Sequence, residues 1–346
     1  MDCSLPETIT SIEQLDDLLS LPTPSVVDAL AKLDGDILVL GVAGKMGPTL
    51  ARMAVRASEA AGVKRQVIGV ARFSNPAEQA KLEAWGIKTI KADLLDERKL
   101  ASLPEAPNLV YMAGMKFGST GQEALTWAMN CYLPGRVCVR YASSRIVAFS
   151  TGNVYGLTPV TGGGSIETDV PNPQGDYATS CLGRERIFEH FGRSAKMPMA
   201  TIRLNYATEL RYGVLVDLAR KIASGLPIDL AMGHCNVIWQ GDANAMSLAA
   251  FAHAASPPFM LNVAGPELLS VRKVCEQLGR LMDKPVQFTG SEAPDALLNN
   301  GQLGHRLFGY PRVALGQLLA WVAAWVTSGG ASLGKPTHFE TRDGKF

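Results

Sequence analysis

The sequence lacks the residue spacings that accompany metal centres and disulfide frameworks. Its six cysteines form no CxxC pair and its five histidines form no HExxH motif, so we expect neither a bound metal nor a disulfide scaffold. Most of the cysteines are therefore interpreted as buried free thiols. They are Cys3, Cys131, Cys138, Cys181, Cys235 and Cys275.

An excess of charge of one sign and a long apolar run are also missing. Lysine and arginine number 33 against 32 acidic residues, so neither nucleic acid nor an anionic membrane is an expected partner. The longest apolar runs, such as residues 37–40 and 318–326, are shorter than the about 20 residues that span a bilayer. The first residues are acidic where a secretory signal is basic, and we expect a soluble, cytoplasmic protein.

The composition, 47% hydrophobic and 19% charged, is sufficient to form a buried core. Along the sequence, short apolar segments alternate with segments of helical pattern. The expected strands are 37–40, 66–70, 87–91, 109–112, 146–149 and 200–204, and the expected helices are 47–61, 76–85, 97–100 and 123–130. This alternation predicts a Rossmann-type α/β fold, with a doubly wound parallel sheet covered by helices on both faces. Ligands of such sheets bind beyond the carboxyl ends of the strands, so functional residues should follow the strands.

Changes in this pattern divide the chain. Residues 1–35 are expected to form a helical extension, and residues 36–205 an NAD(P)-binding Rossmann domain with a returning segment near 236–258. Residues 206–330, which combine short helices with loops rich in glycine and proline, are expected to form mainly a smaller α/β substrate-binding lobe. The polar residues 331–346 are expected to be a surface tail.

A glycine-rich loop directly follows the first expected strand and opens a helix. In Gly41-Val-Ala-Gly44-Lys45-Met46-Gly47, the first glycine permits a tight turn, the second lets backbone approach a pyrophosphate, and the third lets the helix pack on the strand. The helix start adds amide donors and partial positive charge. The loop therefore predicts a dinucleotide site; the alternative is a glycine-rich structural turn.

The end of the second strand bears on the choice between NAD and NADP. An acid there would favour NAD by accepting from the ribose 2′-hydroxyl, but this chain has Arg72 and Ser74, which can bind a 2′-phosphate. The two residues favour NADP, unless Arg72 is simply a solvated arginine. Asp93 follows the third strand, where its carboxylate can accept from the adenine amino group.

Further motifs follow in order along the chain. They are Ala113-Gly114-Met-Lys116, Asn130, Phe149-Ser-Thr151-Gly-Asn153-Val-Tyr155-Gly156, Tyr177-Ala-Thr-Ser180, Arg203-Leu-Asn205-Tyr206 and Asn262-Val-Ala-Gly265. Together with the glycine loop, they resemble the extended short-chain dehydrogenase/reductase family, in its NAD-dependent epimerase/dehydratase branch, over about residues 35–326. The first motif is similar to the alanine-glycine-x-lysine segment of UDP-galactose epimerases.

The resemblance implies roles for individual residues. Thr151 would hydrogen-bond the reacting oxygen, and Tyr177 would exchange the hydroxyl proton while a hydride passes to the nicotinamide. Further cofactor contacts are implied for Leu94, Ala113, Gly114, Lys116 and Asn130, and substrate contacts for Lys116, Thr151, Asn153, Tyr177, Asn205 and Arg211, with Tyr212 in the same loop as a further candidate. Arg203 is a further candidate on the substrate side, and the alternative is that it forms a structural ion pair.

The chain departs from the family at the cation that assists the tyrosine. A phenol with a reference pKa of about 10 needs a nearby positive charge to give up its proton near neutral pH. The family supplies a lysine four residues after the tyrosine, where this chain has Cys181. Three interpretations stay open. The oxidised nicotinamide with Lys116 or Arg184 supplies the charge, or Cys181 is a nucleophile, or the chain has lost its chemistry and kept the cofactor.

A second departure concerns the reaction type. The dehydratases carry an Asp-Glu pair directly after the threonine, where this chain has Gly152-Asn153, and 4,6-dehydration is disfavoured. The leading hypothesis is an NAD(P)-dependent oxidoreductase or epimerase acting on a sugar, sugar nucleotide or related polyol. The alternative is a catalytically impaired NAD(P)-binding sensor or scaffold. The sequence leaves the oligomeric state open, with a homodimer the commonest assembly of soluble proteins.

Overall fold

A seven-stranded parallel sheet forms the centre of the protein. The computed structural model describes residues 5–116, 118 and 120–344, so Cys3 and the last two residues of the expected tail lie outside the described part. The strands, in their order across the sheet, are β12 (Phe259–Val263), β7 (Met199–Leu204), β5 (Arg145–Thr151), β4 (Asn108–Tyr111), β1 (Ile37–Leu40), β2 (Val67–Ala71) and β3 (Lys88–Lys91). All neighbouring pairs are parallel, which confirms the expected Rossmann-type α/β fold. The strand order reverses between β1 and β4, and this position predicts the ligand site.

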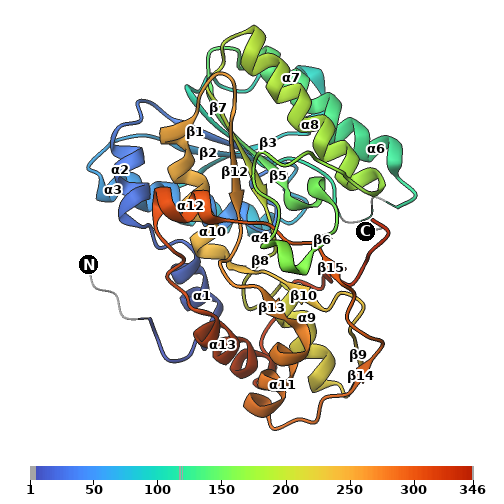
Figure 1. Ribbon diagram of the computed structural model, residues 1–346. Helices are drawn as coiled ribbons and strands as arrows, with labels where there is room; N and C mark the ends of the chain where they lie inside the picture. The colour runs from blue at the N-terminus through green and yellow to red at the C-terminus, as the bar shows by residue number, and fades with distance from the viewer. Residues whose placement is uncertain (1–4, 117, 119, 345–346) are drawn as a thin grey trace.

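Helices cover both faces of the sheet because successive side chains of each strand point to opposite faces. Ile37 and Val39 pack with α2, α3 and α10, whereas Leu38 and Leu40 pack with α5, α7 and α8 on the other face. Figure 1 shows α2, α3 and α10 on one side of the sheet and α7 and α8 on the other. The helices of this domain are α2 (Pro24–Ala31), α3 (Gly47–Ala60), α4 (Pro76–Ala84), α5 (Glu97–Ala101), α6 (Glu123–Trp127), the π-helix η1 (Ala128–Tyr132), α7 (Leu133–Arg140), α8 (Gly175–Ser194), α10 (Gln240–Ala249) and the 3-10 helix η4 (Ala250–His253).

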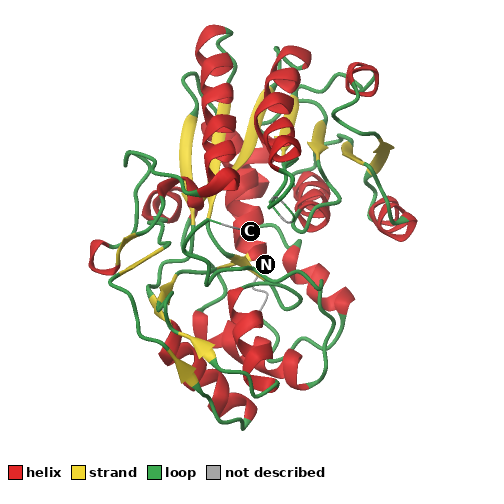
Figure 2. Cartoon of the chain, turned by 90° about the vertical axis from the view of Figure 1, so that its right-hand side faces the viewer, coloured by secondary structure: helices red, strands yellow, loops and turns green. Residues whose placement is uncertain are grey.

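A smaller lobe lies below the sheet domain in Figures 1 and 2. Its core is built from α9 (Val214–Ala223), α11 (Val271–Met282) and α13 (Leu315–Thr327), and α1 (Ile12–Leu19) of the N-terminal extension packs into the same core. Short strands pair around it: β6 (Thr158–Pro159) with β15 (Asp295–Ala296), β8 (Ala207–Thr208) with β11 (Ile238–Trp239), β9 (Ile228–Asp229) with β14 (Phe288–Thr289), and β10 (His234–Cys235) with β13 (Leu269–Ser270). Two 3-10 turns, η2 (Gly152–Tyr155) and η3 (Val160–Gly162), follow β5 and β6.

The segment that returns to the sheet domain extends beyond the expected residues 236–258. α10 and η4 pack on the sheet face, and β12 then adds a seventh strand beside β7. The expected segment ends at Pro257-Pro258, where two prolines break the local pattern, but a strand begins directly after them. The helix α12 (Gln302–Phe308) also packs on β12 and therefore belongs with the sheet domain rather than with the lobe.

Most residues of the expected surface tail are exposed, and the tail is attached to the rest of the molecule at several points through residue 344. Thr337 and Phe339 are buried, and Thr337 donates from its amide and its hydroxyl to Asp217 Oδ2 of α9, at 2.8 and 2.6 Å. At the far end, Gly344 lies against Gly175 at the start of α8. The polar composition gave no sign of these attachments, because partners in the lobe, as well as water, satisfy polar groups of the tail.

Three further findings concern thiols, metal ions and membranes. In the described part of the chain, the five cysteines are free, and no cluster of three or more His, Cys, Asp or Glu side chains could hold a metal ion. No helix within the described ranges combines the length and apolar character needed to cross a bilayer.

Candidate active site

The glycine loop joins β1 to α3 at the reversal of strand order. Gly41 has a φ of +87°, and a Cβ there would lie 2.8 Å from the backbone nitrogen of Ala113. A Cβ on Gly47 would lie 2.2 Å from the carbonyl oxygen of Val42, so this glycine lets the helix start close to the strand. At Gly44 a Cβ would meet only the Gly41 oxygen, at 3.3 Å, which leaves one side of the loop open for a ligand.

The start of α3 fits the pyrophosphate of a dinucleotide. Met46 occupies the N-cap position and forms no side-chain hydrogen bond to the first turn. The first amides of a helix have no partner within the helix, and together with the helix dipole they favour an anion. The glycine loop and α3 would therefore hold the pyrophosphate through backbone donors.

The expected adenosine contacts lie at the neighbouring strand ends. Arg72 and Ser74 follow β2 and are exposed, and Asp93, which follows β3, is exposed as well. Asp93 Oδ1 accepts from the amide of Leu95 at 3.0 Å, which fixes its loop. The side chain of Leu94 is buried in the core of the sheet domain, so only its backbone could reach a cofactor.

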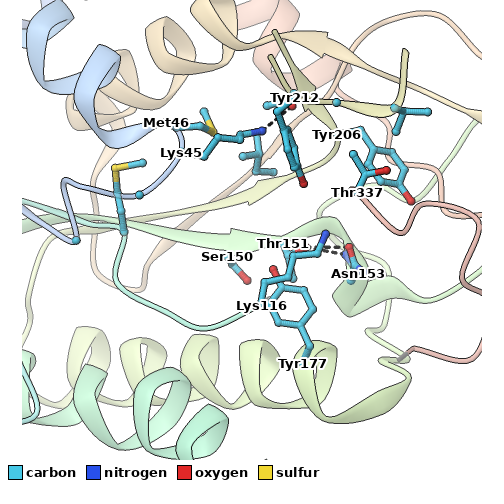
Figure 3. A pocket seen from close by; sticks show the side chains of 17 residues that line it. Lys45, Met46, Lys116, Ser150, Thr151, Asn153, Tyr177, Tyr206, Tyr212 and Thr337 are labelled. Atoms are coloured by element: carbon cyan, nitrogen blue, oxygen red, sulfur yellow. Dashed lines mark hydrogen bonds between the residues drawn. The ribbon is translucent and has the colours of Figure 1, made fainter. Parts of the chain in front are cut away.

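A cavity of about 220 Å³ lies between the glycine loop and the lobe (Figure 3). The glycine loop contributes Gly41 and Gly44, and the sheet domain also contributes Lys116, Thr151, Asn153 and Tyr177. The opposite wall comes from the lobe, with Tyr206 and Tyr212, and from the packed tail, with Thr337. The structure thus brings together residues from widely separated parts of the sequence.

Thr151 and Tyr177 form the centre of this site. Thr151 ends β5, Tyr177 lies in the first turn of α8, and their side chains are hydrogen-bonded. The Thr151 hydroxyl also donates to Asn153 Oδ1 at 3.0 Å. Burial raises the pKa of Tyr177 above its ordinary value. Tyr177 is therefore a neutral phenol that needs a positive charge nearby in order to ionise.

Cys181 follows Tyr177 by one helical turn and is 1% exposed. It packs with Val154 and Tyr155, and its side chain is hydrogen-bonded to Tyr177. Burial raises the pKa of the thiol, so Cys181 stays neutral. A neutral thiol provides neither a cation nor a thiolate nucleophile, and this environment does not favour the interpretation of Cys181 as a nucleophile.

Two lysines line the cavity. Lys116 Nζ lies 5.6 Å from the centroid of the Tyr177 ring, and burial lowers the pKa of Lys116 to about 8. Lys45 Nζ donates to the carbonyl of Ala207 at 2.8 Å and lies 3.8 Å from the centroid of the Tyr212 ring. Burial lowers the pKa of Lys45 to about 7. Lys45 was expected at the cofactor, but its side chain connects the glycine loop to the lobe.

Asn130 lies behind the cavity rather than in its wall. It is fully buried, its Oδ1 accepts from the amide of Met115 at 2.9 Å, and its Nδ2 donates to Ser180 Oγ at 2.9 Å. Gly114 passes over the same region, where a Cβ would lie 2.4 Å from Arg184 Nη2. Asn130 therefore anchors the loop that carries Lys116, and its buried amide is hydrogen-bonded within the protein.

Two of the expected substrate residues are placed elsewhere. Asn205 is 1% exposed and donates to Asn236 Oδ1 at 2.7 Å. Arg211 forms ion pairs with Glu209 and Asp16, both at 3.1 Å, and connects the lobe to α1. Neither residue lines the cavity, because each is already bonded to protein partners.

Comparison with known proteins gives the site its context. The model of the NAD-dependent epimerase/dehydratase family matches residues 37–235, whereas a search of curated proteins by sequence finds no match. Solved structures with a similar fold include UDP-glucuronic acid 4-epimerase from Bacillus cereus, in complex with UDP-glucuronic acid and NAD, at 17% identity and a TM-score of 0.68, covering 85% of this chain and 99% of that one. They also include dTDP-glucose 4,6-dehydratase from Streptomyces venezuelae, at 18% identity and a TM-score of 0.71, covering 85% and 97%.

The solved structures are too distant in sequence to show more than the fold. The family match is more extensive, since residues 37–235 are over half of the 346 residues and include the glycine loop, Thr151 and Tyr177. On this match and on the convergence of those three features at one cavity, the chain belongs to the NAD-dependent epimerase/dehydratase family.

Proposed function

We propose that the protein interconverts an alcohol and a ketone on a sugar or sugar nucleotide. The observation that carries this proposal is the hydrogen-bonded pair of Thr151 and Tyr177, which faces the same cavity as Gly41 and Gly44. A bound nicotinamide dinucleotide supplies the acceptor and donor of the hydride. Thr151 would hold the reacting oxygen, and Tyr177, in its ionised phenolate form, would take the hydroxyl proton as the hydride leaves and the carbonyl forms, and would give the proton back on reduction.

Epimerisation or simple alcohol–ketone redox fits this cavity better than 4,6-dehydration. A dehydratase must protonate a leaving hydroxyl and remove a proton from carbon, which carboxyl groups can do. Among the described residues that line the cavity, none is aspartate or glutamate, and the Asn153 side chain is bonded to Thr151. Support for sugar nucleotides comes from relatives of similar fold that hold UDP-glucuronic acid or UDP-glucose.

The test uses the full chain with NAD or NADP and a panel of UDP- and dTDP-hexoses together with the free sugars. Proton NMR would follow the appearance of an epimer, and absorbance of the reduced nicotinamide would follow net oxidation. We expect at least one substrate to give one of these products. Cofactor binding by native mass spectrometry, combined with no product from any member of the panel, would contradict the proposal.

A non-catalytic cofactor-binding protein is the second candidate. The observation that favours it is the neutral, buried Cys181 at the position where the family has a cation. Such a protein would bind the dinucleotide as tightly when Tyr177 is replaced by phenylalanine, and it would turn over nothing. Comparing binding and turnover in the same two proteins therefore separates the two candidates.

The preference for NADP stays a proposal that rests on Arg72 and Ser74, since relatives of similar fold hold NAD. If Arg72 binds a 2′-phosphate, Arg72→Ala should weaken NADPH binding about tenfold, as expected for a charge-assisted hydrogen bond, and change NADH binding less than about twofold. Isothermal titration with both cofactors measures this. Wild-type protein that binds NADH more tightly, with Arg72→Ala unchanged for both cofactors, would contradict the preference.

A further inference from the structure

Arg184 is a buried positive charge on α8, the helix that carries Tyr177. It follows Cys181 by three residues and Tyr177 by seven on α8, spacings that place all three on one side of the helix. Arg184 is 6% exposed, and its guanidinium donates to the carbonyl of Phe149 at 2.8 Å and to Asn130 Oδ1 at 2.5 Å. Its Nε has no hydrogen-bond partner among the described residues.

The charge of Arg184 is not neutralised locally. Within the described ranges, Arg184 forms no ion pair with a carboxylate, and the adjacent Glu185 is paired with Arg203 at 2.7 Å. The titratable groups that interact with Arg184 are Cys181 and Tyr177 on α8, Tyr111 on β4 and Cys131 on η1. None of these side chains is ordinarily negative, so the field of the guanidinium reaches Tyr177 without a counter-ion in between.

Burying a charge without an opposite charge is costly, and such charges are concentrated at functional sites. The hydrogen bonds of Arg184 to neutral acceptors do not by themselves require a positive charge, because a neutral amide could donate to the same oxygens. The feature that a neutral side chain could not reproduce is the effect of the charge on its neighbours. The positive charge of Arg184 would act on Tyr177 in this way and favour its ionised form, against the larger opposing effect of burial.

We propose that Arg184 supplies, from behind Cys181, the positive charge that stabilises the ionised form of Tyr177. The family has a lysine at the position of Cys181, whereas this chain would provide the positive charge three residues later on α8. Arg184 is a positioning residue that acts through Tyr177. This role rests on the proposed function, because it matters for turnover only if Tyr177 exchanges a proton with substrate.

Lys116 is the competing cation. Its Nζ lies 5.6 Å from the centroid of the Tyr177 ring, on the cavity side, and it also interacts with Cys181 and Asp217. Burial lowers the pKa of Lys116 to about 8, so this lysine is still largely charged at neutral pH and loses its charge as the pH rises above that value. The Arg184 guanidinium keeps its charge on both sides of that pH, so its effect on Tyr177 does not fade as the pH rises above neutral.

The kinetic test compares Arg184→Gln, which keeps a hydrogen-bond donor and removes the charge, with wild type. A positive charge within reach lowers a phenol pKa by about one to two units, so the acidic limb of the kcat/KM profile should move up by that amount in Arg184→Gln. The activity at neutral pH should fall by about 10- to 100-fold as a result. In the double variant Cys181→Lys/Arg184→Gln the acidic limb should return to its wild-type pH, and in Arg184→Lys, which keeps a positive charge, the limb should stay at its wild-type pH. Arg186→Gln, an exposed arginine on the same helix, is the matched control.

Two outcomes of this comparison would overturn the proposal. Reduced activity in Arg184→Gln with an unmoved acidic limb would show that Arg184 only holds Asn130 and the loop before Lys116. A limb that moves in Lys116→Met but not in Arg184→Gln would assign the charge to Lys116.

A second readout does not depend on turnover. The protein is produced with 3,5-difluorotyrosine, whose phenol ionises nearer neutral pH, and the fluorine NMR signal of residue 177 is assigned by its loss in Tyr177→Phe. Arg184→Gln should raise the pKa of this residue by about one to two units, and Arg186→Gln should leave it unchanged. An unchanged value in Arg184→Gln would overturn the proposal whether or not the protein is an enzyme. A raised value in a protein without turnover would support the role of Arg184 and contradict the proposed function.

Discussion

Replacing Tyr177 by phenylalanine is expected to lower kcat/KM by about 10²–10⁴-fold, the usual contribution of a positioned acid–base group. The substitution removes the phenol oxygen that is hydrogen-bonded to Thr151 and keeps the ring that packs beside Cys181. Cofactor affinity should change little if, as we propose, the glycine loop holds the pyrophosphate through backbone groups. Steady-state kinetics on the substrate found in the panel, together with cofactor titration, measures both quantities.

Tyr310→Phe is the matched control for this loss. The Tyr310 side chain is 63% exposed, and its hydroxyl donates to Gln302 Oε1 at 3.3 Å, away from the cavity. Its activity should equal that of wild type. Activity of Tyr177→Phe within about twofold of wild type would remove Tyr177 from the mechanism, since a general acid–base contributes far more than this.

Replacing Arg203 by methionine should lower the free energy of unfolding by about 3–5 kcal/mol, because it leaves a buried carboxylate without its partner. Arg203 Nη2 lies 2.7 Å from Glu185 Oε2, and the two side chains are 5% and 4% exposed. Arg203 also donates to the Tyr155 hydroxyl at 2.7 Å, while Ser150 Oγ donates to Glu185 Oε1 at 2.6 Å. Urea denaturation followed by circular dichroism measures the loss.

Two companion variants test the cause. The exposed pair of Arg186 and Glu189 should contribute less than about 1 kcal/mol, so Arg186→Met should be close to wild type. The double variant Arg203→Met/Glu185→Leu should recover much of the stability, since removing both charges leaves none unpaired. Equal losses in Arg203→Met and Arg186→Met would show that burial of the Arg203 pair does not matter for stability.

The fold could be predicted in large part because its signals are local. The apolar run 37–40, the glycines that follow it and the helix from Gly47 lie within one short stretch, and the structure places β1 and α3 there. The expected ion-pair alternative for Arg203 is also what the structure shows. β12 was missed because it is an edge strand that begins directly after two prolines.

The strand pattern predicted the part of the cavity whose residues follow strands of the sheet, and the family resemblance added Tyr177 of α8. Thr151 ends β5, and the loop with Lys116 follows β4, so the strand-end rule brings them together. The wall made by Tyr206 and Thr337 depends on how the lobe and the tail pack, for which the sequence carries no local signal. The ion pair of Arg211 with Asp16 has no local signal either, since Asp16 lies in the N-terminal extension, far away in sequence.

The packed tail also sets the order in which the site is completed during synthesis. Thr337 leaves the ribosome after every other described residue that lines the cavity. The contact of Gly344 with Gly175, at the start of the helix that carries Tyr177, forms later still. A nascent chain can therefore build the sheet and the glycine loop while its reaction cavity still lacks one wall. Full enclosure of the substrate must follow translation of the tail.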